Sequence, residues 1–302
     1  RIPNMLDAAI DGSFKGIYIQ GEDILQSDPN TRHVAEGLAA MECVIVHDLF
    51  LNETANYAHV FLPGSTFLEK DGTFTNAERR IQRVRAALRP VGGSKADWQI
   101  LAEIARAMGA RGFAYQGPEE IWDEVRALVP GARGMTYARL DAGGLQWPCP
   151  TENHPGTSIL HRETFAGNPT ATLRCVEHRA TAEQTSHDYP FLLITGRSLY
   201  QFNAGTMTLR TKNTVLHAAD YLDIAPSDAA RLGLRTGERG RLRSRYGAAC
   251  LPLRLNENLQ PGELFATFHT ADVFLNQVTS PLRDGQTAAP EYKVTAVQVE
   301  RD

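Results

Sequence analysis

Apolar and polar residues alternate in blocks over the first third of the chain, in the order typical of a parallel α/β domain. Short apolar runs predict strands at Gly16–Gln20, Cys43–Val46 and Val60–Leu62. Amphipathic segments predict helices at Met5–Ile10 and from about Thr31 to Met41. Because the second helix lies between the first two strands, these strands are expected to pair in parallel. The pattern predicts an α/β Rossmann-like domain with a parallel sheet.

Two further helices are expected in this domain. The first runs from Asp97 to Met108, and its predicted apolar face consists of Ile100, Leu101, Ile104 and Ala105. The second runs over Ile121–Leu128, with Pro118 in the turn that opens it. Residues 130–186 are rich in Gly, Pro, Thr and His, and we interpret them as an irregular crossover. The predicted α/β domain therefore covers residues 1–186.

The pattern changes to short strands after residue 186. The predicted strands are Phe191–Thr195, Tyr221–Ile224, Gly240–Arg245, Ala248–Leu255, Leu264–His269 and Tyr292–Val299. A short helix is expected at Pro226–Leu232, where Gly233 ends it. These elements predict a β-barrel domain at residues 187–302. One of its strands carries an alternating row, Arg239, Arg241, Arg243 and Arg245, which we interpret as a solvated face in preference to an anion-binding or subunit-docking patch.

Each predicted strand of the α/β domain is followed by small or polar residues. Asp23, His47 and the pair Gly64-Ser65 stand at these positions. Ligands of open parallel sheets bind beyond the carboxyl ends of the strands, so a nucleotide-like ligand is expected there. No G-x-G-x-x-G fingerprint is present. The long polar stretch from His47 to Gln82 is interpreted as a binding loop, with a plain surface loop as the alternative.

Composition narrows the class of protein. The chain has 302 residues, 42% of them hydrophobic, and a net charge of −4, which gives no case for nucleic acid as a partner. No apolar run approaches about 18 residues and no signal peptide is recognisable, so no membrane span is expected. The chain begins with Arg1, which suggests processing or a longer parent protein.

Cysteine and histidine positions give no metal signature. The cysteines, of which Cys43 is interpreted as a small core residue of its strand, lie far apart and form no C-x-x-C pair. The nine histidines show no ligand spacing either. We therefore expect no protein-ligated metal and no disulfide framework, and a reducing cytoplasm fits.

Several ordered motifs resemble the molybdopterin oxidoreductases, the enzymes that carry a bis-molybdopterin guanine dinucleotide with Mo or W. The motifs similar to their third domain are Asn52–Ala55, Leu62–Gly64, Glu69–Asn76 and Arg80–Gln82. Those similar to their C-terminal, double-psi-like barrel are Thr195–Arg197, Asp228–Gly233 and Pro290–Lys293. Within the family, Leu199–Thr208 is most similar to the catalytic subunit of cytoplasmic NAD-dependent formate dehydrogenases.

The resemblance implies a set of cofactor-binding residues. By position in the family motifs these are Asp23, His47, Gly64, Ser65, Asp97, Arg197, Ser198, Phe202, Asn203, His269, Asn276, Tyr292 and Lys293. Asp97 would recognise the guanine base, since a carboxylate can accept from N1–H and the N2 amine together. Its alternative role is that of a helix N-cap.

The resemblance also implies what lies outside the chain. The family's catalytic Cys or selenocysteine, its substrate Arg and its iron–sulfur cysteines match nothing here, so the chain corresponds to a C-terminal portion without catalytic residues and is expected to be inactive alone. The intact enzyme would oxidise formate to CO2 and pass electrons through Fe-S clusters and flavin subunits to NAD. The implied partners are the N-terminal part of the subunit and those NAD-reducing subunits. The alternatives are a cofactor-free large subunit of an NADH-quinone oxidoreductase and a pterin-binding module without catalysis.

Overall fold

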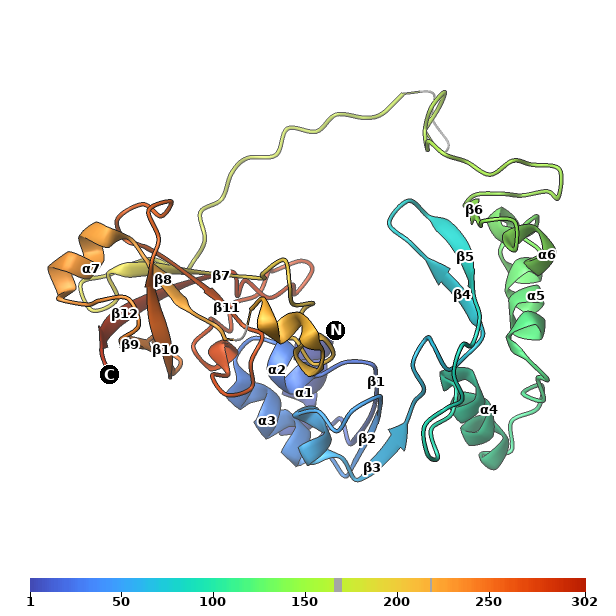
Figure 1. Ribbon diagram of the computed structural model, residues 1–302, viewed down its shortest axis with the longest axis horizontal. Coiled ribbons are helices and arrows are strands. Elements are labelled where there is room, and N and C mark those ends of the chain that lie inside the picture. Colours follow the sequence, from blue (N-terminus) through green and yellow to red (C-terminus); the bar gives the residue numbers. More distant parts are fainter. Residues whose placement is uncertain (166–169, 218) are drawn as a thin grey trace. The chain divides into compact units, whose positions relative to one another are not determined.

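The computed structural model describes residues 1–165, 170–217 and 219–302, and it divides into two compact units (Figure 1). Unit 1 comprises Arg1–Phe61 and Arg179–Asp302, and unit 2 comprises Leu62–His178. These units group the chain differently from the predicted domains 1–186 and 187–302, and that domain division stays a prediction.

Unit 1 begins with a small α/β layer that matches the predicted order of elements. Its sheet has the order β1-β2-β3, formed by β1 (Gly16–Gln20), β2 (Cys43–Asp48) and β3 (Val60–Pro63). β1 and β2 pair in parallel, from Gly16 opposite Cys43 to Gln20 opposite His47, as expected. The parallel sheet is therefore confirmed.

Three helices cover this sheet: α1 (Ile2–Ile10), α2 (Ile24–Ser27) and α3 (Thr31–Ala40). Asn30 caps α3 by accepting a hydrogen bond from the amide of His33. α1 packs closely on α3, because a Cβ at Gly37 would lie 2.8 Å from Leu6 Cδ2 and 3.2 Å from its Cα. Side chains such as Leu6, Leu38 and Val44 form the core between helices and sheet. The sequence pattern did not predict α2, which is only one turn long.

The interpretation of Cys43 as a core residue is wrong, because its side chain is exposed. Side chains alternate between the two faces of a strand. In β2 the fully buried positions are Val44 and Val46, which places Cys43 on the opposite face at the strand's first residue.

The second layer of unit 1 is a closed six-stranded barrel with the order β10-β8-β11-β7-β12-β9, which confirms the predicted barrel. Its strands are β7 (Phe191–Gly196), β8 (Leu222–Ile224), β9 (Arg239–Arg243), β10 (Ala248–Leu255), β11 (Glu263–Thr267) and β12 (Val294–Arg301). Helix α7 (Pro226–Leu232) ends at Gly233, as predicted. The interior is filled by Phe191, Leu193, Leu242, Leu251 and Leu264, among others.

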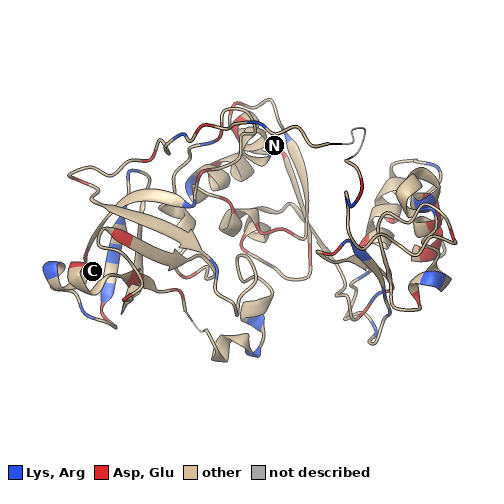
Figure 2. Ribbon diagram, turned by 90° about the horizontal axis from the view of Figure 1, so that it is seen from above, with Lys and Arg blue, Asp and Glu red and all other residues tan. Residues whose placement is uncertain are grey.

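The arginine row lies on the outside of the barrel. On β9, Gly240 and Leu242 point inward, whereas Arg239, Arg241 and Arg243 are exposed. Basic and acidic residues are interspersed in the view of Figure 2. The exposure of these three arginines is as the solvated-face interpretation expects, whereas Arg245 pairs with the buried carboxylate of Glu183; the choice between a solvated face and a docking patch stays a prediction.

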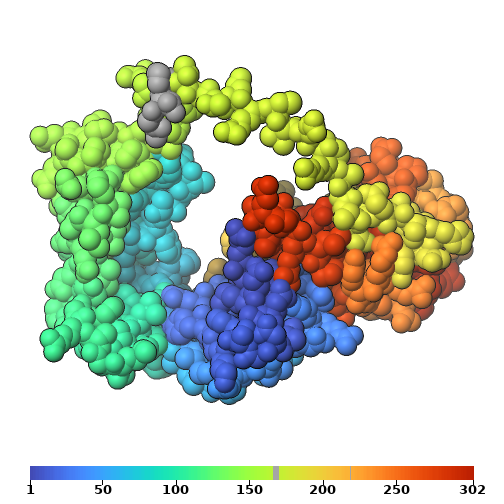
Figure 3. Space-filling model, turned by 180° about the vertical axis from the view of Figure 1, so that it is seen from behind, coloured from blue at the N-terminus to red at the C-terminus, as the bar shows by residue number. Residues whose placement is uncertain are grey.

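Buried amide side chains join the two layers of unit 1. Gln26 of α2 donates to the carbonyls of Ala204 (2.8 Å) and His269 (2.6 Å). Asn276, in the turn η5 (Leu275–Gln277), donates back to the carbonyls of Gln26 and Ser27. Figure 3 shows the blue N-terminal segment against red segments from near the C-terminus, where Arg283 and Asp7 form an ion pair of 2.5 Å.

Unit 2 contains an antiparallel sheet of the order β4-β5-β6 and three helices. The strands are β4 (Gly72–Thr75), β5 (Arg80–Val84) and β6 (Leu145–Gln146), and the helices are α4 (Asp97–Ala107), α5 (Pro118–Leu128) and α6 (Tyr137–Leu140). A 3-10 turn, η2 (Pro130–Ala132), follows α5. No helix among the described residues combines the length and apolar character needed to cross a membrane.

Three expectations need correction. The stretch from His47 to Gln82 is more regular than expected, because besides the predicted strand at Val60–Leu62 (β3) it contains the turn η1 (Thr54–Tyr57), β4 and part of β5, in which β-branched and aromatic residues favour strands. The apolar face of α4 contains Ile100 but not Leu101, which is 42% exposed. The segment 130–186 is not wholly irregular, since it holds η2, α6 and β6; its residues 166–169 lie outside the described part of the chain.

Candidate functional site

Most of the predicted cofactor-binding residues of unit 1 gather at one end of the barrel. β7 and β11 are parallel, so the residues that follow them, Arg197-Ser198 and Phe268-His269, emerge at the same edge. β12 runs antiparallel to β7 and begins opposite Ile194, which brings Tyr292-Lys293 to that edge as well. The barrel topology therefore places these three dipeptides together although they are far apart in sequence.

Two cations flank an aromatic ring at this end. The Arg197 guanidinium carbon lies 5.6 Å, and the Lys293 Nζ atom 5.1 Å, from the centre of the Phe268 ring. Burial, assisted by the nearby positive charge of Arg197, lowers the pKa of Lys293. Within the described residues neither cation pairs with a carboxylate; Arg197 donates instead to Oδ1 of Asn203 (2.6 Å). Two neighbouring cations without a carboxylate are suited to an anionic ligand.

The loop that follows β7 is held by His269. The amide of Ser198 donates to Nε2 of His269 (3.0 Å), and Nδ1 of the same ring lies 2.7 Å from the carbonyl oxygen of Asn203. Gly205 continues the turn with a φ of 72°, where a Cβ would lie 2.8 Å from the carbonyl oxygen of His269. Oγ of Ser198 is buried without a hydrogen-bond partner, so it is available to a ligand.

Asp23 follows β1, as the sequence indicates, whereas His47 lies within β2, one residue before its end; internal contacts engage both. The Asp23 carboxylate accepts from the amide and hydroxyl of Thr54 (3.0 and 2.7 Å), from the amide of Glu53 and from the hydroxyl of Thr206. The His47 ring is buried, and its Nδ1 lies 2.6 Å from the Tyr18 hydroxyl oxygen. Their assignment to the cofactor stays a prediction.

Two other predicted residues differ strongly in exposure. Phe202 is 72% exposed, next to Asn203, whose φ of 50° is left-handed. Asn276 is 1% exposed and uses its NH2 group to bind α2, so its evident role is to join the two layers. Both assignments also stay predictions.

His269 belongs to a polar cluster that the sequence did not reveal. One side-chain ligand atom each of His217, Asp220 and His269 lies within 4.8 Å of the others, a spacing compatible with a metal ion. The Asp220 carboxylate, however, accepts from the hydroxyls of Thr267 and Thr270 and from the amide of Thr270 (2.7 Å). Both ring nitrogens of His269 are also engaged. We therefore interpret the cluster as a hydrogen-bonded polar core, and no sequence spacing signals it.

Unit 2 holds the remaining predicted residues. Gly64 forms a parallel bridge with Lys95, and the amide of Ser65 donates to the Lys95 carbonyl (2.9 Å). Oγ of Ser65 is buried without a partner.

Asp97 is the first residue of α4, after the N-cap Ala96, so the N-cap alternative for Asp97 is wrong. Its carboxylate forms an ion pair with Lys70.

Asp97 and Lys70 lie on the wall of a groove in unit 2. Its volume is about 440 Å³, and aromatic side chains form much of the lining. The lining residues that matter for recognition are Lys70, Phe74, Asp97, Trp98, Trp122 and Tyr137. A carboxylate beside aromatic rings provides hydrogen-bond acceptors and stacking surfaces, the two features that bind a heterocyclic base.

Two family models match the chain and cover both of its ends. Residues 1–107 match the model described as molybdopterin oxidoreductase, and residues 191–296 match the model described as Molydopterin dinucleotide binding domain. The chain therefore belongs to the molybdopterin oxidoreductase family, whose cofactor is a molybdopterin guanine dinucleotide carrying Mo or W. The resemblance to the molybdopterin oxidoreductases is confirmed, whereas the closer resemblance to cytoplasmic NAD-dependent formate dehydrogenases stays a prediction.

Curated relatives match almost the whole chain. F420-dependent formate dehydrogenase subunit alpha of Methanocaldococcus jannaschii is 40% identical over 303 residues, which cover 99% of this chain and 45% of that protein. Formate dehydrogenase H of Escherichia coli is 33% identical over 306 residues, covering 99% and 43%. Assimilatory nitrate reductase catalytic subunit of Bacillus subtilis is 33% identical over 307 residues, covering 98% and 43%. The chain thus spans less than half the length of these relatives.

A solved structure shows the same fold. Acetylene hydratase from Pelobacter acetylenicus superposes with a TM-score of 0.77 over 99% of this chain and 46% of that chain. The sequence identity is 16%, so this likeness concerns the fold alone.

Proposed function

We propose that this chain is the C-terminal, cofactor-holding portion of the catalytic subunit of a Mo- or W-dependent formate dehydrogenase. The observation that carries the proposal is the cationic end of the barrel, where Arg197 and Lys293 flank Phe268 beside the buried hydroxyl of Ser198. Relatives named as formate dehydrogenases support formate as the substrate. In this proposal the α/β layer is part of a Rossmann-like domain and the barrel is of the double-psi type.

The residues at the barrel end fit the chemistry of the dinucleotide. Its phosphates and pterin oxygens are acceptors, and the site offers two cations and a hydroxyl donor whose own partners are few. Arg197 would donate hydrogen bonds to the cofactor from its planar guanidinium. Lys293 would supply a positive charge, and pairing this charge with an anionic group of the cofactor would offset its desolvation cost. The bound cofactor supplies the redox chemistry at its metal. This chain contributes binding, orientation and exclusion of water.

In unit 2, we assign Asp97 to guanine recognition. The carboxylate lies on an aromatic-lined groove of about 440 Å³, ample for a purine base. Lys70 now pairs with Asp97, so the lysine would move from the carboxylate as the base arrives. Gly64 and Ser65 would donate from a backbone amide and a buried hydroxyl to phosphate or ribose oxygens.

The rest of the electron pathway is also a proposal. The sequence resemblance implies Fe-S clusters, flavin subunits, a cytoplasmic location and NAD as the acceptor, whereas the relative from Methanocaldococcus jannaschii is named F420-dependent. Reduction of NAD and of F420 by the intact complex, measured side by side with formate as donor, distinguishes the two acceptors. A cofactor-free subunit is the weaker alternative, because it would leave two neighbouring cations without a carboxylate partner among the described residues, and the buried Ser198 hydroxyl without a ligand.

Arg197 is the residue with which to test the proposal. Arg197→Lys in the full-length subunit keeps the charge but loses the planar donor geometry. We expect the molar content of pterin and of Mo or W to fall several-fold, and formate oxidation to fall with it. Arg241→Lys on the solvated face of β9 is the matched control and should leave both unchanged. Wild-type metal and pterin content in Arg197→Lys would overturn the assignment of the barrel end as the cofactor site.

A further inference from the structure

Contacts within the protein engage both ring nitrogens of His269, so neither is free for a ligand, although the residue stands in the middle of the candidate site. Its side chain is fully buried, with 0% exposure. Its ring connects two parts of the loop that follows β7: Nε2 accepts from the Ser198 amide (3.0 Å), and Nδ1 lies 2.7 Å from the Asn203 carbonyl oxygen. Asn203 is also the partner of Arg197, because its side-chain oxygen accepts a hydrogen bond from the guanidinium.

The two contacts define the protonation state of the ring. A backbone amide can only donate, so Nε2 must be unprotonated, and a carbonyl can only accept, so Nδ1 must carry the hydrogen. His269 is therefore neutral, in the Nδ1–H form. Burial lowers its pKa, which favours this neutral form at physiological pH.

A second proton on His269 would have no acceptor. It would sit on Nε2 and face the N–H of Ser198, so that two donors would oppose each other across a buried contact. The charged groups around the ring are Asp220, which raises its pKa, and His217 and Arg197, which lower it. Asp220 already accepts three hydrogen bonds from Thr267 and Thr270, so it is not free to accept the additional proton.

We propose that His269 is a positioning residue which, as the neutral Nδ1–H imidazole, fixes the Ser198–Asn203 loop in its anion-binding shape, and that protonation of the ring releases this loop. The inference rests on the proposed anion site at Arg197 and Lys293. It assigns a different role to His269 than the direct cofactor contact expected from the family motif. It also makes anion binding dependent on pH: binding is full while the ring is neutral and weakens as acidification protonates it.

The protonation state can be measured without any ligand. In the whole chain labelled with 15N-histidine, the His269 ring should show the Nδ1–H tautomer at pH 7.5. On acidification, the backbone amide resonance of Ser198 should shift with the same midpoint as the His269 ring. An Nε2–H tautomer, or a Ser198 amide that does not follow the His269 titration, would falsify the inference whatever the chain binds.

Ligand binding then tests the consequence. With pyrophosphate as the probe, we expect affinity of the whole chain to fall about tenfold once His269 is protonated, the effect of losing a buried hydrogen bond that shapes the site. His269→Gln keeps one acceptor and one donor but cannot titrate, so its affinity should fall less on acidification than that of wild type, by only the amount that protonation of pyrophosphate itself causes in every variant. His187→Gln, an exposed histidine of unit 1, is the control and should behave as wild type.

These outcomes separate the two proposals. If wild type does not bind pyrophosphate at any pH while the tautomer and the Ser198 shift are as expected, the anion site fails and the positioning role of His269 stands. If pyrophosphate binds but His269→Gln keeps the wild-type pH dependence, the positioning role fails and the anion site stands.

Discussion

At the scale of single residues, the informative groups are buried polar atoms that have no hydrogen-bond partner within the protein. The hydroxyls of Ser65 and Ser198 and the Oδ2 atom of Asp28 are buried without a partner. A buried polar atom without a partner lowers stability unless water, an ion or a ligand satisfies it. The two serines stand at predicted cofactor positions. Asp28 is not a predicted cofactor residue, and its burial bears on the stability of the fold instead.

Asp28 gives a pH prediction for stability. Burial, with a smaller contribution from the Glu22 charge, raises the pKa of Asp28 to about 6 from an ordinary value of 3.8. The folded chain therefore holds a proton that the unfolded chain has released, and stability falls as pH rises from about 4 to about 6. Asp28→Asn removes this cost. Relative to wild type it should gain up to about 2–3 kcal/mol at pH 7 and almost nothing at pH 4.

Urea unfolding of both proteins at a series of pH values measures this difference. Asp188→Asn, at an exposed position of unit 1, is the control and should show no such trend. A constant difference between Asp28→Asn and wild type from pH 4 to pH 7 would mean that Asp28 titrates normally.

Asp97 gives a prediction of specificity. If its carboxylate accepts from N1–H and N2 of guanine, Asp97→Asn presents an NH2 donor to those donors. Hydrogen bonds to charged groups contribute about 1.5–3 kcal/mol, so affinity for GDP should fall about tenfold or more. Calorimetric titration with GDP and IDP, which lacks the N2 amine, is the measurement. Equal GDP affinity in wild type and Asp97→Asn would overturn the assignment of Asp97 to base recognition.

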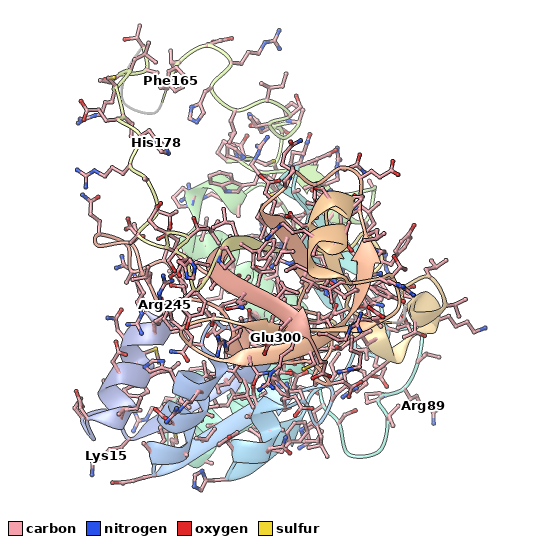
Figure 4. All side chains as sticks on the ribbon, turned by 90° about the vertical axis from the view of Figure 1, so that its left-hand side faces the viewer. Lys15, Arg89, Phe165, His178, Arg245 and Glu300 are labelled. Atoms are coloured by element: carbon pink, nitrogen blue, oxygen red, sulfur yellow. The ribbon has the colours of Figure 1, made fainter. Side chains whose placement is uncertain are left out.

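At the scale of elements, the barrel is held by a segment outside its strands. Residues 179–190 lead into β7, and the Glu183 side chain within them is 98% buried. Its carboxylate accepts from the guanidinium of Arg245 (2.6 Å), the hydroxyl of Tyr246 (2.8 Å) and the amide of Ala296 (3.3 Å). Arg245 is labelled in Figure 4, on the turn between β9 and β10. One carboxylate therefore connects the entry segment to two parts of the barrel.

Removing this charge should loosen the entry segment. Glu183→Gln keeps the shape but replaces one acceptor oxygen by a donor, and we expect a loss of about 2 kcal/mol in the free energy of unfolding. Amide hydrogen exchange of residues 180–186 should rise while the β10 amides change little. Glu257→Gln, at an exposed position, should leave stability unchanged. Unaltered exchange in Glu183→Gln would show that the segment is held by other contacts.

At the scale of the whole molecule, the chain joins binding elements from two compact units. Unit 1 holds the cationic barrel end, and unit 2 holds the groove beside Asp97. The relatives are more than twice as long as this chain. No family motif for the metal-proximal thiolate or selenolate occurs in this sequence.

The chain alone is therefore expected not to oxidise formate. The measurement is dye-linked formate oxidation by the purified 302-residue chain after incubation with cofactor, compared with the same chain without cofactor. The two rates should be equal. Formate-dependent dye reduction above the cofactor-free level would show that groups within this chain suffice for the reaction.

The sequence by itself determined the local elements and the family. The parallel β1–β2 pair, the barrel strands and the end of α7 at Gly233 follow from side-chain periodicity and turn residues, which depend on neighbours a few positions apart. The one-turn helix α2 and the exposure of Cys43 escaped this reasoning, because a single turn has no periodicity and an apolar run does not say which face is covered.

Only the tertiary structure decided how the site is built. Ser198 and Asn203 lie 71 and 66 positions from His269, and no local pattern indicates that one imidazole would bond to both backbones. The same holds for Asp220, whose partners Thr267 and Thr270 come from a distant strand end. Hydrogen-bond partners of buried groups are fixed by which strands close the barrel side by side. The sequence therefore supplied the candidate residues, whereas the contacts that hold each of them in place follow from the three-dimensional arrangement alone.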